Sequence, residues 1–428
     1  MRSNLNLEIQ DAITILFYCT ICIMLISHPR IMIRHAPWIT SIETFCCTLA
    51  TLFPKVFYTS VLTWSVYALI VHGCYDTLMT TQETSIFAIV IGLIGITLYI
   101  FCLYTYFKVL SAGPGSPSDF EELRIRNILL LSKPKYNSAN PYDINDNVAT
   151  SASLLANAEG VDEIESVESE QPPSEYMTLH MLKSNNSSYR YCTKCSVWKP
   201  DRCHHCSTCN RCILRMDHHC PWFAMCVGFY NHKFFAQFLM YLTVYSGFDF
   251  VVSLSILWKF FADEKYNDQY LSLNLVFLFV LSLAFFITVG GFLAFLLYLV
   301  FRNKTTIEFQ ENRWNFKNDK NGKSFQYEFD GSGKKKKLGN IFDLGCGRNW
   351  RSIMGPSWYY WLLPVTVTNK SIDARLENGI NFEIDQDVYD RWCYNAQLQD
   401  QLNQQLADYK NRIRMEREGT QTTGANPF

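Results

Sequence analysis

The amino-acid sequence predicts an α-helical polytopic membrane protein: a four-helix transmembrane bundle with a cytosolic, Cys-rich, zinc-binding module between spans 2 and 3. Four long apolar runs approach the roughly 20 residues that a helix needs to cross a bilayer. Eight of the 16 Cys lie between Cys192 and Cys226. Hydrophobic residues reach 49% of the chain, and charged residues only 18%. The net charge of -1 predicts no strong attraction to nucleic acid.

The apolar runs are long and nearly free of charge; they comprise residues 56–74, 86–107, 235–257 and 273–300. Buried helices of a soluble domain are the alternative, but such helices are usually much shorter. Asp249 is the one charged residue inside the runs, and we expect it to make a polar contact near the far end of its helix. A fifth run, residues 12–26, is short for a span, and we expect it to form a peripheral or interfacial helix.

The distribution of Lys and Arg predicts the orientation of the spans. The loop at residues 75–85 has neither residue, and acidic residues balance two Lys in the loop at residues 258–270. Most basic residues lie within residues 108–233 and from Arg302 onward. By the positive-inside rule, both termini and the long central loop therefore face the cytosol. Reducing conditions there disfavour disulfides, so we expect the Cys cluster to bind metal.

The predicted division of the chain follows from these spans. Residues 136–182 lack Lys and Arg and carry several acids, which predicts a disordered linker. We see no tandem repeat. The segments are an N-terminal cytosolic or peripheral segment (1–55), spans 1–2 (56–107), a cytosolic loop with the acidic linker (108–190), a Cys-rich zinc-binding domain (191–234), spans 3–4 (235–301) and a cytosolic C-terminal region (302–428).

Twelve Cys and His residues are candidate metal ligands: Cys192, Cys195, Cys203, His204, His205, Cys206, Cys209, Cys212, His218, His219, Cys220 and Cys226. Three Cys pairs have two-residue gaps, a spacing typical of zinc sites. A structural zinc site takes four ligands, so two sites leave four candidates over. A third site would need the adjacent Cys203 and His204, which converge poorly on one metal. The spacing alone leaves open which residues remain, and whether the sites are sequential or interleaved.

The stretch Asp217-His218-His219-Cys220 suits catalysis as well as metal binding. Cys and His bind zinc as thiolate and imidazole, but an acid, an imidazole and a thiol also make an activated nucleophile with an oriented base. A leftover set that includes a reactive Cys is more economical than a third metal site. Two other classes of protein stay open: a membrane-anchored zinc adaptor of the RING type, and a transporter with a regulatory zinc domain.

Residues 192–235 resemble the Cys-rich domain of the DHHC protein S-acyltransferases, or palmitoyltransferases, at fixed spacing over the whole stretch. Three flanking segments look like further motifs of the family: Gly113-Pro114-Gly115, with Gly where the family usually has Asp; Thr305-Thr306-Ile307-Glu308; and the aromatic region around Asn340 and Asn349. Residues 199–206 and 354–358 are most similar to the fungal vacuolar protein fatty acyltransferases. One departure is Ala224-Met225, where many members carry Asn.

The resemblance implies two structural zinc ions at interleaved sites: Cys192, Cys195, His205 and Cys212 at one, and Cys206, Cys209, His219 and Cys226 at the other. It also implies a catalytic Cys-rich domain. Cys220 would be the nucleophile, His218 would take its proton, and Asp217 would orient His218. We expect Thr305 or Thr306 to bond Asp217.

The implied activity is the transfer of a long-chain acyl group from palmitoyl-CoA to substrate proteins through an acyl-enzyme intermediate on Cys220. Lys199 and Arg202, with Arg215 as a further candidate, would meet the CoA phosphates, and Trp222 would lie where the acyl chain meets the headgroup. The partners implied are membrane-associated proteins with a cytosolic Cys and the lipid bilayer, without nucleic acid. The vacuolar membrane is the expected location, with the Golgi or endoplasmic reticulum as alternatives.

Overall fold

The computed structural model describes most of the chain outside the N-terminus and the acidic linker. The described residues are 39–81, 85–126, 172–178, 190–263, 270–311, 327–329, 335–368, 370–371, 373 and 378–422. The peripheral helix predicted at residues 12–26 lies outside them. So does the linker predicted at residues 136–182, apart from residues 172–178.

Four helical segments are long and apolar enough to cross a membrane, which confirms the predicted bundle. They are α2 (Ile39–Tyr67) continued by the π-helix η1 (Ala68–Thr81), α3 (Ser85–Ala112), α5 (His232–Ala262) and α6 (Leu273–Phe301). Each predicted apolar run lies within one of them. Ile86, Leu93 and Ile100 on α3 keep 81%, 61% and 56% of their surfaces exposed. Such a row of exposed apolar side chains fits contact with lipid rather than water.

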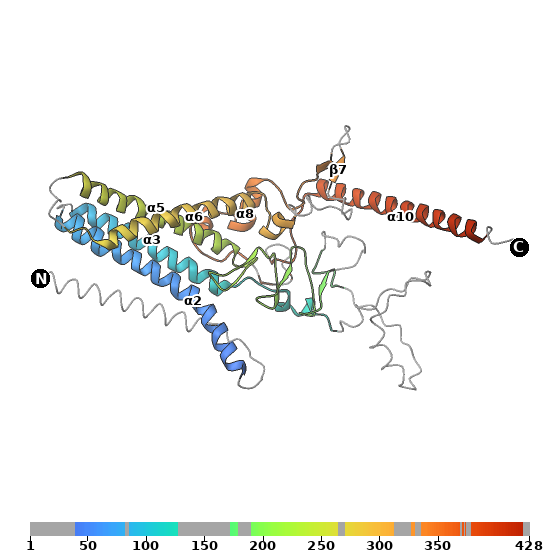
Figure 1. Ribbon diagram of the computed structural model, residues 1–428, viewed down its shortest axis with the longest axis horizontal. Coiled ribbons are helices and arrows are strands. Elements are labelled where there is room, and N and C mark those ends of the chain that lie inside the picture. Colours follow the sequence, from blue (N-terminus) through green and yellow to red (C-terminus); the bar gives the residue numbers. More distant parts are fainter. Residues whose placement is uncertain are drawn as a thin grey trace.

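The spans lie side by side, and the Cys-rich module sits at one end of the bundle (Figure 1), here called the module end. Polar pairs join the helices inside: Thr63 Oγ1 lies 3.1 Å from the Tyr99 hydroxyl, and Ser65 Oγ lies 2.8 Å from the Tyr245 hydroxyl. These hydrogen bonds tie α2 to α3 and α5 without placing a charge in the apolar interior.

The module is built from three short antiparallel hairpins. Their strands are β1 (Tyr191–Cys192) with β2 (Val197–Trp198), β3 (His204–Cys206) with β4 (Arg211–Ile213), and β5 (His218–Cys220) with β6 (Met225–Val227). The strands are too short to form a core of their own. The module therefore depends on its ligand side chains and on the bundle for its shape.

The Gly-Pro-Gly segment after α3 fixes the module to the bundle. The Leu214 amide donates to the Gly115 carbonyl over 3.2 Å. Gly115 has φ +81°, and a Cβ there would lie 2.5 Å from the Tyr230 ring, so the close packing requires glycine. Two short 3-10 turns, η2 (Pro117–Asp119) and η3 (Glu121–Leu123), follow, and the Ser116 hydroxyl caps the first.

The C-terminal region packs against the module end through α8 (Cys346–Met354) and α9 (Trp358–Leu362). The Asn349 side chain is fully buried and donates to the Phe301 carbonyl at the end of α6 over 2.8 Å. Gln237 of α5 donates to carbonyls of α9, including that of Tyr360 over 3.0 Å. These bonds hold the aromatic segment where the spans end.

Two elements lie beyond this packed region. The hairpin of β7 (Tyr327–Phe329) and β8 (Lys335–Lys337) contains part of the basic run at residues 334–337. Helix α10 (Gln386–Thr422) extends away from the body (Figure 1). Its Leu398, Leu402 and Leu406 are about half exposed, at 44%, 51% and 55%, as on a surface helix.

Candidate active site and metal centres

The three hairpins of the module repeat every fourteen residues, which corrects the expectation that the chain has no tandem repeat. Cys192, Cys206 and Cys220 occupy the same position at the end of the first strand of each hairpin. Four residues further on, Ser196, Asn210 and Ala224 have φ values of 51°, 48° and 51°. The repeat escapes inspection because, outside the Cys and His positions, the three copies share few residues. The shared left-handed turn becomes visible only in the backbone.

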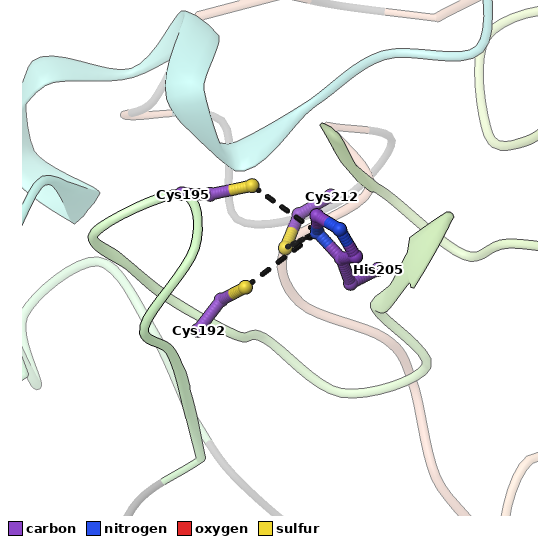
Figure 2. Close-up of side chains that lie close together, drawn as sticks. All are labelled: Cys192, Cys195, His205 and Cys212. Atoms are coloured by element: carbon purple, nitrogen blue, oxygen red, sulfur yellow. Dashed lines mark hydrogen bonds between the residues drawn. The ribbon is translucent and has the colours of Figure 1, made fainter. Parts of the chain in front are cut away.

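The first predicted ligand set comes together at the first two hairpins. Figure 2 shows the side chains of Cys192, Cys195, His205 and Cys212 pointing toward one another. The three sulfurs lie 3.6, 3.3 and 3.9 Å from His205 Nδ1. Zinc bonded tetrahedrally to sulfur and imidazole nitrogen separates these atoms by about 3.6 Å. The donor set and its spacing therefore fit a zinc ion.

The second predicted set comes together one hairpin further on, from Cys206, Cys209, His219 and Cys226. The sulfurs lie 3.7, 3.3 and 3.6 Å from His219 Nδ1. In both sets the His and the last Cys are direct cross-strand partners, His205 with Cys212 and His219 with Cys226. Each such pair closes on the two cysteines of the preceding hairpin. The clusters are therefore interleaved, as the resemblance implied.

The third hairpin has the same turn but has no cysteine three residues after Cys220. Phe223 stands where the first two hairpins have Cys195 and Cys209. Its ring is 1% exposed and stacks 4.8 Å from the Tyr106 ring of α3. Within the described residues no further group of potential ligands includes Cys220. The Cys220 thiol thus has the backbone setting of a metal ligand without a complete ligand set around it.

Asp217 is a buried carboxylate with three hydrogen-bond donors. His218 Nδ1 lies 2.7 Å from its Oδ2, the Thr306 hydroxyl donates to Oδ2 over 2.8 Å, and the Thr306 amide donates to Oδ1 over 2.9 Å. This confirms Thr306 as the predicted partner. Burial raises the pKa of Asp217, but the hydrogen bond from His218, the nearby histidines and the Thr306 amide outweigh burial and hold the pKa below its usual range.

His218 sits between Asp217 and Cys220 at the wall of the bundle. Burial lowers the pKa of His218, but its hydrogen bonds to Asp217 and Cys220 and their charges outweigh burial and raise the pKa to about 9. The ring of Phe235 lies 5.4 Å from the imidazole. The raised pKa makes the imidazole a strong base beside the Cys220 thiol.

An apolar cavity of about 490 Å³ opens beside these residues and runs into the bundle. His218, Cys220 and Trp222 line its module end, and Ser65, Tyr245 and Asp249 line its deep end. Asp249 is 1% exposed, and its Oδ1 has no hydrogen-bond partner among the described residues. The polar residue expected at the far end of a helix is thus a cavity-lining residue. The Ser65–Tyr245 pair was not predicted, because no sequence signal links two polar residues on different spans.

The basic residues proposed for CoA phosphates differ in their accessibility. Arg202 is 1% exposed, and its guanidinium donates to both carboxylate oxygens of Glu308 over 2.7 and 2.9 Å. It also donates to the Asn303 side chain and carbonyl over 2.9 Å each. The expectation that Arg202 meets a phosphate is therefore corrected, since its donors are used inside the protein. Its partner Glu308, the last residue of the segment Thr305-Thr306-Ile307-Glu308, was not predicted.

The other candidates for contact with CoA also differ in their accessibility. Arg215 is 3% exposed and donates to His232 Nδ1 over 2.6 Å. Burial, followed by the neighbouring Arg202, lowers the pKa of Arg215 to about 9. Lys199 is half-buried at the end of β2. Trp222 is 57% exposed at the mouth of the cavity, a position that a bound headgroup would reach.

Comparison with known proteins identifies the family. Residues 185–313 match the family model of the DHHC palmitoyltransferases. The chain is 95% identical to palmitoyltransferase PFA3 of Debaryomyces hansenii, over 95% of this chain and all of that protein. It is 47% identical to palmitoyltransferase PFA3 of Candida albicans, over 89% of this chain and 96% of that protein. It is 33% identical to human palmitoyltransferase ZDHHC20, over 77% of each chain. The chain belongs to the DHHC palmitoyltransferase family.

Proposed function

We propose that this membrane-embedded protein S-palmitoyltransferase uses Cys220 as its nucleophile, His218 as the proton acceptor and Asp217 as the group that orients His218. One observation carries the proposal: Cys220 lies where the Asp217–His218 pair meets the opening of an apolar cavity. A second thiol in the same turn position, Cys206, belongs to a metal cluster instead. The surroundings of each sulfur, rather than its backbone position, separate the two roles.

The reaction proceeds in two balanced transfers. The Cys220 thiol gives its proton to Nε2 of His218, and the sulfur attacks the thioester carbon of palmitoyl-CoA. The bond from that carbon to the CoA sulfur breaks, and the CoA thiolate takes the proton from His218. A substrate Cys then loses its proton to His218 and attacks the acyl-Cys220 carbon, and the Cys220 thiolate leaves and is reprotonated. One thioester replaces another in each step, so the residues need only position and deprotonate the thiols.

The length of the cavity matches that of an extended palmitoyl chain. Phe235 is level with His218, and Asp249 lies fourteen residues further along α5. An α-helix rises about 1.5 Å per residue, so the two positions are about 21 Å apart. An extended palmitoyl chain measures about 19 Å from its carbonyl carbon, given the usual C–C bond length. Its end would therefore reach the Ser65–Tyr245 pair and the level of Asp249.

We assign zinc to both Cys/His clusters, because three thiolates and one imidazole are the donors that structural zinc takes. Bound zinc would close the hairpins into a rigid unit, since such ligands are not assembled in an unfolded chain. His219 is held by the second cluster, while His218 and Cys220 lie on either side of it in β5. Neighbours two apart in a strand share a face. His218 and Cys220 are thus held together by the residue between them.

The remaining assignments concern the surroundings of the site. We place the module end in the cytosol, where acyl-CoA and reduced Cys are present, with the vacuolar membrane as the location. Residues 191–234 form the catalytic domain and residues 302–428 the region that supports it. Lys199 and Trp222 meet the CoA headgroup. Arg202 instead joins the module to the end of α6 through Glu308 and Asn303.

The test is acyl labelling of the full-length protein. Cys220→Ser is expected to abolish hydroxylamine-sensitive labelling from palmitoyl-CoA and to leave two zinc ions per chain. Cys346→Ser is the matched control, because Cys346 is an exposed cysteine on α8, and it should keep both. Labelling that survives in Cys220→Ser removes Cys220 from its assigned role.

A further inference from the structure

A second cavity, of about 330 Å³, lies beside the start of α5. It shares no lining residue with the apolar cavity beside Cys220, here called the acyl cavity. On α5, Lys233 and Phe234 line the second cavity, whereas Phe235 and Phe238 line the first. Helix α5 would therefore separate a molecule in the second cavity from Cys220. Such a molecule would have a role other than that of acyl donor or acceptor.

The second cavity is strongly cationic. Its lining has five basic side chains and one acidic one: Arg202, Arg215, Lys233, Arg348, Arg351 and Glu383. Glu308 offsets the charge of Arg202. The other cations face one another across a small space, so an anion bound there would interact with several of them.

Two guanidinium groups form the mouth. Arg348 and Arg351 are exposed and lie three residues apart on α8, so they share one side of the helix. Buried Asn349 fixes the other side to the end of α6. Arg348 makes only an exposed contact of 3.7 Å with Glu383, and Arg351 has no ionic partner among the described residues. Both guanidinium groups are thus available to a ligand.

The inner wall presents a donor without an acceptor. His232 Nδ1 lies 2.6 Å from Arg215 Nη1, and because a guanidinium only donates, Nδ1 must accept. The proton of the neutral ring is therefore on Nε2. That atom is buried and has no hydrogen-bond partner among the described residues, although His232 lines the cavity. Buried donors are nearly always paired, so this N–H marks a place for an acceptor.

We propose that this cavity binds a phosphate-bearing anion, with Arg348 and Arg351 gripping the phosphate and His232 Nε2 donating from within. Planar guanidinium groups match phosphate oxygens in paired hydrogen bonds. The neighbouring α9 exposes Trp358 and Tyr359 by 66% and 42%, as aromatic residues do where a span meets the membrane surface. A phosphorylated lipid headgroup and a soluble phosphate compound share the required chemistry, and both can reach such a position.

The experiment compares three forms of the full-length protein in phosphatidylcholine nanodiscs. The test variant is Arg348→Ala with Arg351→Ala. Arg391→Ala is the matched control, because Arg391 is exposed on α10, does not line the cavity and has a hydrogen bond to the backbone of its own helix. Calorimetry measures binding of inositol trisphosphate, and native mass spectrometry counts phosphatidylinositol monophosphate added to the nanodiscs. Zinc content and acyl labelling at Cys220 report on folding.

The double variant is expected to lose binding by at least about tenfold, since each charge-assisted hydrogen bond contributes about 1.5–3 kcal/mol. Arg391→Ala should bind as the unaltered protein does, and Arg351→Lys should restore part of the affinity in an Arg348→Ala background. Loss in both arms shows a phosphate site that soluble compounds can reach; loss in the lipid arm alone identifies a headgroup. Equal binding by the double variant and the control overturns the proposal. So does competition by CoA together with a raised KM for palmitoyl-CoA, which would make the cavity part of the donor site.

Discussion

The Thr306 side chain, just beyond the end of α6, donates a hydrogen bond of 2.8 Å to the Asp217 carboxylate in the module. This bond joins the end of a transmembrane helix to the residue that is hydrogen-bonded to His218. Movement of α6 relative to the module would therefore misplace the imidazole before it disturbed the metal clusters. The site depends on the relative position of the end of α6 and the module, which are distant in sequence.

Thr306→Val should lower the rate of acyl-enzyme formation by about tenfold, because a hydrogen bond to a charged acceptor contributes about 1.5–3 kcal/mol. The Thr306 amide still donates to Asp217, so the variant should fold and keep two zinc ions. Thr306→Ser retains the hydroxyl and should recover most of the rate. Single-turnover labelling from palmitoyl-CoA measures the effect, and an unchanged rate in Thr306→Val would show that the amide alone suffices.

The buried Arg202–Glu308 pair predicts an effect on stability. Glu308→Ala leaves the Arg202 guanidinium inside the protein without its carboxylate, which costs about 3–5 kcal/mol when a buried pair is broken. Thermal unfolding in detergent should show a lower Tm for this variant. Exchange of the exposed Glu383, which makes a 3.7 Å contact with Arg348, is the control and should change Tm little. A Tm equal to that of the control would mean that the pair adds nothing to stability.

The two metal clusters should differ in their effect on catalysis. Cys195→Ser and Cys209→Ser remove equivalent ligands, one from each cluster, and each should lower zinc content by about one ion. Cys209→Ser frees His219, which lies between His218 and Cys220, and should abolish acyl labelling. Cys195→Ser disturbs hairpins one step further from Cys220 and should leave residual labelling. Zinc analysis and labelling of both variants test this order, and the reverse order would contradict the assigned geometry.

The deep end of the acyl cavity should control chain length. Asp249 presents a carboxyl oxygen without a partner among the described residues, where the end of a palmitoyl chain would lie, and apolar methylenes gain nothing from contact with it. Asp249→Val should therefore raise the use of stearoyl-CoA relative to palmitoyl-CoA, with Asp249→Asn as the polar control. Mass spectrometry of the acyl group on Cys220 measures the ratio. An unchanged ratio in Asp249→Val would place the end of the chain elsewhere.

The sequence predicted those features that depend on local pattern. Apolar run length located the four spans, and the spacing of Cys and His, with the family resemblance, supplied both ligand sets. Features that depend on burial were missed. The sequence alone makes Arg202 a candidate phosphate ligand, because nothing in it shows that Glu308 faces Arg202 across a gap of many residues. The Ser65–Tyr245 contact and the second cavity likewise depend on how helices rotate against one another, which apolar spans of this kind leave undetermined.

Two copies of the same hairpin place cysteines of different kinds in one position: Cys206, a candidate metal ligand, and Cys220, the proposed nucleophile. A metal ion in the second cluster would keep the sulfur of Cys206 as a bound thiolate, and thiolates held in this way serve as ligands rather than nucleophiles. In the next copy of the turn, the Phe223 ring lies where the first two copies have their second cysteine. The Cys220 thiol is therefore left without a complete set of metal ligands. The neighbouring side chains, rather than the turn itself, distinguish a cysteine suited to metal binding from one suited to reaction. The module can therefore hold the sulfur of Cys220, the proposed nucleophile, as rigidly as a ligand, and still leave it outside the two sets that would bind metal ions.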